Sequence, residues 1–122
     1  MPDVTAIDED ILVAEYQLHA KTGLIDIRDE FEKRLKIKNT PHLLMVKIHG
    51  MAIFDQDAQS FIAGEEEGDI TRAVAILCDK EVGYYEHGKL LIKYFVGVKD
   101  LRFPVELFDN ENDAINWLKS QK

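Results

Sequence analysis

Apolar residues are nearly continuous in two stretches of this chain, residues 42–50 (HLLMVKIHG) and residues 73–78 (AVAILC). Continuous apolar runs of this length are typical of strands that are covered on both faces of a sheet. The segment between them has helical character. We therefore predict a parallel pair of central strands, at residues 43–48 and 73–78, joined by a right-handed crossover.

Three shorter segments predict the remaining strands. Residues 4–7 and 11–19 lie on either side of a short acidic run, and the second of them alternates apolar and polar residues. This alternation predicts a half-exposed strand that forms a hairpin with the first. Residues 103–108 (FPVELF) predict a short last strand, and Pro104 favours an edge position because proline cannot donate a hydrogen bond to a neighbouring strand.

Residues 24–36 (LIDIRDEFEKRLK) have the periodicity of an amphipathic helix. Its apolar positions share one face: Leu24, Ile27, Phe31 and Leu35. Glu30 precedes Arg34 by four residues, which is the spacing of an ion pair along a helix. We expect this pair on the solvent-exposed side.

Three further helices complete the pattern. One follows the central strand at FDQDAQSF, and a second, in residues 80–96, is weakened by two glycines. The last begins with Asp109 or Asn110 as its N-cap and docks through Ala114, Ile115, Trp117 and Leu118. The order β-β-α-β-α-β-α-β-α predicts one α/β domain over residues 1–122, with a mixed, mainly parallel sheet of four to five strands flanked by helices.

Charge and composition narrow the possible partners. The chain has 15 Lys and Arg residues against 23 Asp and Glu residues, for a formal charge of -8. Such a surface would repel nucleic acid and anionic lipid, so we expect neither as a partner. No apolar run reaches the length of a membrane span, and the N-terminus lacks the pattern of a signal peptide. These features predict a cytoplasmic protein.

Few residues suggest catalysis or cofactor binding. The two serines, Ser60 and Ser120, are not in a Gly-x-Ser-x-Gly turn, and there is no glycine-rich phosphate-binding motif. The single cysteine, Cys78, ends an apolar run and is expected to be buried. We therefore expect no enzyme activity, no catalytic residue and no cofactor.

Two groups of residues could supply metal ligands, but simpler interpretations are favoured for both. The histidines lack the spacing of a shared site and are expected at the surface or at strand ends with ordinary titration: His19, His42, His49 and His87. A run of acids beside Gly64 and Gly68, together with Asp55 and Asp57, could gather a divalent cation, although such a run is more typical of a hydrated loop. Its members are Glu65, Glu66, Glu67 and Asp69. We expect the loop and no metal site.

The strand HLLMVKIHG leads directly into IFDQDAQ, and the chain ends in FPVELFDNENDAINWL, an aromatic-rich strand followed by a capped helix. Together with the order of elements, these segments resemble the SpoIIAA-like, or STAS-type, domains, and in particular an uncharacterised bacterial branch related to anti-anti-sigma factors. The likeness extends over most of the chain. It implies the STAS architecture, a non-catalytic regulatory or protein-interaction role, and a protein partner.

Regulators of the STAS type carry Asp-Ser-Ser-Gly-Leu at the start of the helix after the central strand, and a kinase-like partner phosphorylates the second serine. Aligning Asp55 with the aspartate of this signature places Gln56 and Asp57 at the two serines. The phosphoacceptor is therefore missing, and Asp57 would carry a fixed negative charge in its place. A simpler interpretation is that both aspartates stabilise the first helical turn. The resemblance implies these candidate partner-binding residues: Asp55, Gln56, Asp57, Gln59 and Ser60.

An alternative function is the binding of a small apolar, lipid-like ligand, since STAS domains resemble part of the SEC14-type lipid-binding fold. The segment YYEHGKLLIKYFVG is rich in aromatic and aliphatic side chains. The candidate ligand-binding residues are Tyr84, Tyr85, Leu91 and Phe95. A simpler interpretation is that they form one buried helix face. Exposed aromatic residues would also suit the contact of a homodimer.

Overall fold

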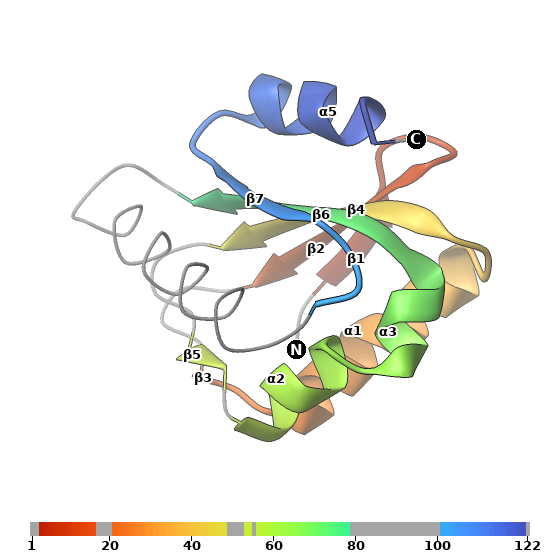
Figure 1. The fold of residues 1–122 in the computed structure, drawn as a ribbon, viewed down its shortest axis with the longest axis vertical. Helices are drawn as coiled ribbons and strands as arrows, with labels where there is room; N and C mark the ends of the chain where they lie inside the picture. The colour runs from red at the N-terminus through yellow and green to blue at the C-terminus, as the bar shows by residue number, and fades with distance from the viewer. Residues whose placement is uncertain (1–2, 17–20, 49–52, 55, 79–100, 122) are drawn as a thin grey trace.

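The computed structural model describes residues 3–16, 21–48, 53–54, 56–78 and 101–121. These residues form a five-stranded sheet with helices on both faces, and a second sheet of two short strands (Figure 1). The strands are β1 (Asp3–Ala6), β2 (Ile11–Tyr16), β3 (Lys21–Thr22), β4 (His42–Ile48), β5 (Ile53–Phe54), β6 (Thr71–Cys78) and β7 (Val105–Phe108). The helices are α1 (Leu24–Ile37), α2 (Gln56–Ile62), α3 (Glu65–Ile70) and α5 (Glu111–Lys119).

The strands of the larger sheet lie in the order β1-β2-β4-β6-β7. The predicted α/β fold with a five-stranded sheet flanked by helices is confirmed, as are the internal positions of β4 and β6 and the edge position of β7. β1 pairs antiparallel with β2, which confirms the hairpin, whereas β2, β4, β6 and β7 are parallel to one another. The sheet is therefore mixed, because β1 adds to its edge in the antiparallel direction.

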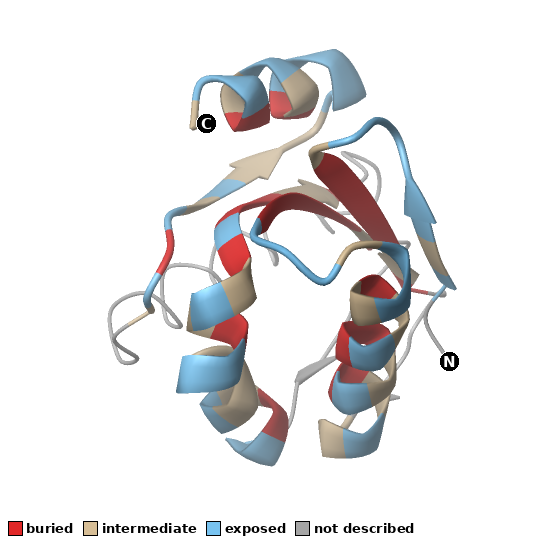
Figure 2. Cartoon of the chain, turned by 90° about the vertical axis from the view of Figure 1, so that its right-hand side faces the viewer, coloured by how far each residue is buried: buried red, intermediate tan, exposed pale blue. Residues whose placement is uncertain are grey.

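The two faces of the sheet are covered by different helices. Helices α1, α2 and α3 lie against one face, and α5 lies against the other (Figures 1 and 2). Side chains alternate between the faces along each strand. On the α1–α3 side the strands contribute Leu12, Ala14, Tyr16, Leu44, Val46, Ile48, Val74 and Cys78. On the α5 side they contribute Ile11, Val13, Leu43, Met45, Ala73 and Ala75.

The prediction that the second strand is half-exposed was wrong. Ile11, Leu12, Val13 and Ala14 are all buried, because β2 lies inside the sheet and has helices over both of its faces. The alternation in its sequence includes only one charged residue in the described strand, Glu15, which is partly exposed. Burial of an internal strand therefore depends on its neighbours more than on its own pattern.

Helix α1 begins after Gly23, whose backbone N–H donates a hydrogen bond to the Asp26 carboxylate at 3.2 Å. Arg34 and Lys36 lie in its last turn, where positive charge is favourable because the helix carbonyls point that way. The backbone N–H of Lys38 donates to the Arg34 carbonyl at 2.8 Å and closes the helix. After α1 the chain reverses direction and enters β4 at His42.

Helix α5 follows the prediction closely. Asn110 is the N-cap, and its side-chain oxygen accepts a hydrogen bond from the backbone N–H of Asp113 at 3.1 Å. Ala114 and Leu118 are fully buried against the sheet. The Trp117 ring lies 5.7 Å from the Phe108 ring, centroid to centroid, which joins the helix to β7.

The acidic run was predicted to be a hydrated loop, and this prediction was wrong. Residues Glu65–Ile70 form helix α3, with Gly64 as its N-cap. A β-carbon on Gly68 would lie 2.4 Å from Cδ of Arg102, so the glycine allows the Arg102 stem to cross α3 closely. The three glutamates of the first turn suit a helix N-terminus, where negative charge is favourable.

Candidate functional site

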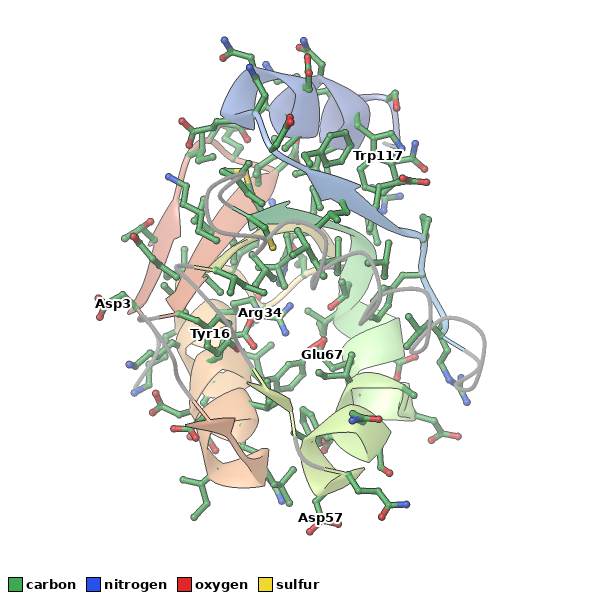
Figure 3. All side chains as sticks on the ribbon, turned by 90° about the vertical axis from the view of Figure 1, so that its left-hand side faces the viewer. Asp3, Tyr16, Arg34, Asp57, Glu67 and Trp117 are labelled. Atoms are coloured by element: carbon green, nitrogen blue, oxygen red, sulfur yellow. The ribbon has the colours of Figure 1, made fainter. Side chains whose placement is uncertain are left out.

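Six polar side chains lie together beneath the sheet, on the side that α1, α2 and α3 cover. We call them the buried polar cluster: Tyr16, Glu30, Arg34, His42, Glu67 and Thr71. All are buried, and Arg34 and His42 are among the largest fully buried side chains of the described residues. Figure 3 shows Arg34 on α1 and Glu67 on α3 pointing toward each other, with Tyr16 nearby.

Arg34 is the centre of the buried polar cluster. Its Nη1 donates to Thr71 Oγ1 at 3.1 Å and lies 3.2 Å from His42 Nε2, while its Nη2 donates to Glu67 Oε1. Its Nε lies 3.2 Å from Glu30 Oε1, although these two atoms are not aligned for a hydrogen bond. The guanidinium thus connects its own helix to α3 and to the first residues of β4 and β6.

Two carboxylates share this one guanidinium. Glu30 Oε2 accepts a hydrogen bond from the Tyr16 hydroxyl at 3.0 Å, and Glu67 Oε2 accepts one from Thr71 Oγ1 at 3.1 Å. Burial raises the pKa of both carboxyls, that of Glu67 to about 7, even though Arg34 acts in the opposite direction. Burial and the adjacent Glu30 also raise the pKa of Tyr16.

His42 is held in its neutral form. Because the Arg34 guanidinium can only donate, His42 Nε2 accepts, and Nδ1 donates to the Thr40 carbonyl at 3.0 Å. Burial lowers the pKa of His42 to about 4, and the charges of Arg34 and Lys38 act in the same direction. His42 lies at a strand end, as the first residue of β4, but the prediction of ordinary titration was wrong because the residue is buried; the other three histidines lie outside the described residues.

The prediction that Glu30 and Arg34 are exposed was also wrong. The i,i+4 spacing of opposite charges is common on helix surfaces, and we read it as such. Yet in a helix of 3.6 residues per turn, positions 30 and 34 lie on the same side as Ile27 and Phe31. Arg34 also stacks on Phe31, with its guanidinium carbon 5.3 Å from the ring centroid. That shared side is the signal that could have identified the pair from sequence.

The chemistry available to the buried polar cluster is proton binding and charge pairing. The residues that the structure describes include no group of three or more His, Cys, Asp or Glu side chains arranged to hold a metal ion. Within the buried polar cluster each carboxylate already accepts a hydrogen bond from a neighbouring side chain. This arrangement joins two helices to three strands.

The residues predicted to bind a partner lie elsewhere, at the start of α2. Gln56, Asp57 and Ser60 are exposed, and Gln59 is partly exposed, whereas Ala58 between them is fully buried. Figure 3 shows Asp57 at the end of the molecule, away from the buried polar cluster and pointing outward. Asp55 lies outside the described residues, so its predicted capping role does too.

Aromatic contacts hold α2 against α1. The Phe31 and Phe61 rings meet edge to face with centroids 5.5 Å apart, and the Arg28 guanidinium carbon lies 5.7 Å from the Phe61 centroid. The opposite side of α2 is thereby left to solvent. The four candidate ligand-binding residues, Tyr84, Tyr85, Leu91 and Phe95, lie outside the described residues, as does the whole helix predicted over residues 80–96.

None of the described helices has the length and apolar composition needed to cross a membrane. No curated protein and no solved structure significantly matches the chain. One protein family does match, the Domain of unknown function (DUF7793), and the match covers residues 5–122. The chain belongs to this DUF7793 family.

Proposed function

We propose that this chain is a non-catalytic protein-interaction module that contacts its partner through the exposed side of α2. The observation that carries the proposal is the division of this helix into two sides. Ala58 is buried and Phe61 packs on Phe31, whereas Gln56, Asp57 and Ser60 face solvent together at helical spacing. A polar surface on a firmly docked helix is well suited to recognition.

The proposal takes the fold to be of the STAS type, since that resemblance assigns recognition to the helix after the central strand. In this chain α2 is the first helix after β4, the middle strand of the larger sheet, and the short strand β5 lies between them. Gln56 and Asp57 occupy the positions of the two signature serines, so the surface carries a permanent charge where such regulators gain and lose a phosphate. An aspartate has about one charge against nearly two for phosphoserine, which makes it a partial mimic.

Charge favours a partner with a basic surface. Asp57 on α2 and the exposed acids of α3, Glu65, Glu66 and Asp69, outnumber Arg28 and Arg102, two exposed cations that contact these helices. The whole chain has a formal charge of -8, which would speed the approach of a cationic protein.

The test uses wild type, Asp57→Asn and Asp57→Ser as baits, and compares the partner proteins that are cross-linked to each bait and captured with it. Asp113→Asn is the matched control, because Asp113 is also an exposed aspartate in a first helical turn but lies on α5, over the other face of the sheet. We expect both Asp57 variants to lose a partner that wild type and Asp113→Asn retain. The melting temperatures of the Asp57 variants should differ from that of wild type by no more than that of Asp113→Asn does. Equal capture by all four proteins would contradict the proposal, as would substrate turnover by the purified chain in a broad hydrolase screen.

A further inference from the structure

The buried polar cluster contains more negative than positive formal charge. Glu30 and Glu67 face a single guanidinium, and His42 is neutral because its Nε2 accepts from Arg34. With both carboxylates ionised, the buried polar cluster would carry one uncompensated negative charge. Burying such a charge is costly, and proteins usually avoid the cost by keeping a proton on one of the groups.

The two carboxylates belong to different helices and have different roles. Glu30 shares α1 with Arg34, so its position relative to the guanidinium is set by the helix itself. Glu67 is on α3 and is the residue through which α3 meets Arg34. Any change in the charge of this pair therefore acts on the contact between α1 and α3.

Among the residues that the structure describes, the remaining neighbours of Glu67 do not neutralise it. Thr71 from β6 donates one hydrogen bond without charge, and Tyr16 from β2 donates to Glu30 instead. Arg102 lies in the segment that leads into β7. Its aliphatic stem crosses α3 at Gly68, but the residue is exposed. The side chains through which α2 packs on α1 and the sheet, Phe61 and Ala58, carry no charge.

From this geometry we propose that Glu30, Arg34 and Glu67 form a proton-binding junction that controls how tightly the α2–α3 segment docks on α1. With one proton on either of the two carboxylates, the junction is electrically neutral and α3 is held against α1. When the proton leaves, the buried negative charge favours an opened arrangement in which Glu67 reaches water. The inference is independent of whether α2 binds a partner.

The direction of the effect follows from the carboxyl itself. Burial raises the pKa of Glu67 from 4.5 to about 7 in the docked arrangement, and exposure to water on opening returns it toward the ordinary value. The docked arrangement therefore binds the proton more tightly than the opened one, and raising the pH favours opening. Between pH 6 and pH 8 the equilibrium constant for opening should increase about tenfold.

The experiment measures amide hydrogen exchange of α2 and α3 at pH 6 and pH 8, corrected for the intrinsic change of exchange rate with pH. We compare wild type with Glu67→Gln, which keeps the side-chain shape and an acceptor oxygen but cannot titrate. Glu66→Gln is the matched control, since Glu66 is the exposed neighbour on the same helix. We expect protection of this segment to fall about tenfold in wild type and in Glu66→Gln, and to be independent of pH in Glu67→Gln.

If Glu67→Gln does not fold, the protonation of the glutamate carboxyl groups can be measured directly by NMR titration of the wild-type protein. Glutamate labelled with ¹³C at its carboxyl carbon should show at least one group in wild type that titrates near neutral pH, and Glu30→Gln should shift or remove that signal. The inference is overturned if every glutamate carboxyl titrates near pH 4.5, or if the corrected protection of α2 and α3 is equal at both pH values in wild type.

Discussion

The two faces of the sheet are held to their helices by different kinds of interaction. On the α5 side, Ile11, Leu43 and Met45 pack on Ala114 and Leu118, and every buried side chain in that group is apolar. On the α1–α3 side, apolar packing surrounds a charged group that is as deeply buried as the core. The α5 face depends mainly on the area and shape of apolar contact, and the ion pair that Lys47 forms there with Glu111 is partly exposed; on the other face the paired charges are buried.

This difference has consequences for how each face responds to change. Apolar contact is lost gradually as side chains become smaller, in proportion to the area and cavity left behind. A buried charge group fails abruptly when one member is removed, since the remaining charge has no partner and no water. The predictions below use substitutions and pH to separate these two behaviours.

The largest effect is expected from Arg34→Met. This substitution removes the guanidinium and leaves Glu30 and Glu67 buried without a positive partner. The free energy of unfolding should fall by about 3–5 kcal/mol. Urea unfolding followed by Trp117 fluorescence measures it, because Trp117 is the only tryptophan.

The control for Arg34→Met is Lys33→Met on the same helix. Lys33 Nζ lies 3.0 Å from Asp29 Oδ2, but its side chain is 37% exposed. Removing this partly exposed ion pair should cost about 1 kcal/mol or less, well below the loss at Arg34. Similar losses in the two variants would show that Arg34 contributes no more than a surface pair does, and the proposed contrast between the faces would then fail.

On the apolar face, Leu118→Ala should lower the free energy of unfolding by about 2–4 kcal/mol, slightly less than Arg34→Met. Leu118 is fully buried between α5 and the sheet, so its truncation leaves a cavity. The loss should be nearly independent of pH, because no titrating group is part of this cluster. Asn116→Ala, an exposed position on the same helix, is the control; a loss that varies strongly with pH would contradict the assignment.

The dependence of stability on pH should reveal two opposing groups. His42 has a pKa lowered from 6.5 to about 4, so its contribution is present above pH 6.5 and is lost as the pH falls through 4. Glu67 has a pKa raised from 4.5 to about 7, so its contribution is present below pH 4.5 and is lost as the pH rises through 7. Between pH 4.5 and pH 6.5 these two contributions offset each other, and a remaining fall in stability with rising pH comes from Glu30, whose pKa burial also raises.

His42→Gln separates the two effects, since glutamine retains an acceptor for Arg34 but does not titrate. With the histidine removed, stability should increase by up to about 3 kcal/mol as the pH falls from 7 to 4.5. Urea unfolding at half-unit steps of pH measures the profile. A His42→Gln profile that coincides with that of wild type would mean that the imidazole is not held neutral by the fold.

The smallest effect is expected at the N-cap of α5. Asn110→Ala removes the oxygen that accepts from the Asp113 N–H, and the melting temperature should fall by the equivalent of about 1 kcal/mol. Asn112→Ala, two residues further on and exposed, provides the comparison. Circular dichroism during heating is sufficient, and equal melting temperatures for the two variants would argue against a capping role.

Much of the fold could be predicted because several segments carry a strong local signal. The continuous apolar runs identified β4 and β6, and their internal positions followed from the need to cover both faces. Pro104 correctly indicated that β7 lies at the edge, and the Asn110 cap and apolar face of α5 were both recognised. These features depend on residues close together in the chain, where sequence patterns are most informative.

The buried polar cluster could not be predicted in the same way. Arg34, Glu67, His42 and Thr71 come from four separate elements, and each has a common surface role when considered alone. The acidic run at α3 was interpreted as a hydrated loop because nothing nearby in sequence indicates that one of its glutamates meets an arginine 33 positions earlier. The candidate residues of α2 remain a prediction, with Gln56, Asp57 and Ser60 exposed in the structure.

Sequence alone determined where apolar residues recur, and therefore the positions of β4, β6, α1 and α5. It also determined the negative charge of the chain. The tertiary structure alone decided which charged residues are removed from water, because burial depends on what packs against a side chain from elsewhere in the chain. Once Arg34 is enclosed by α3 and the sheet, desolvation makes its pairing with Glu30 and Glu67 far stronger than the same residues would show on an isolated helix.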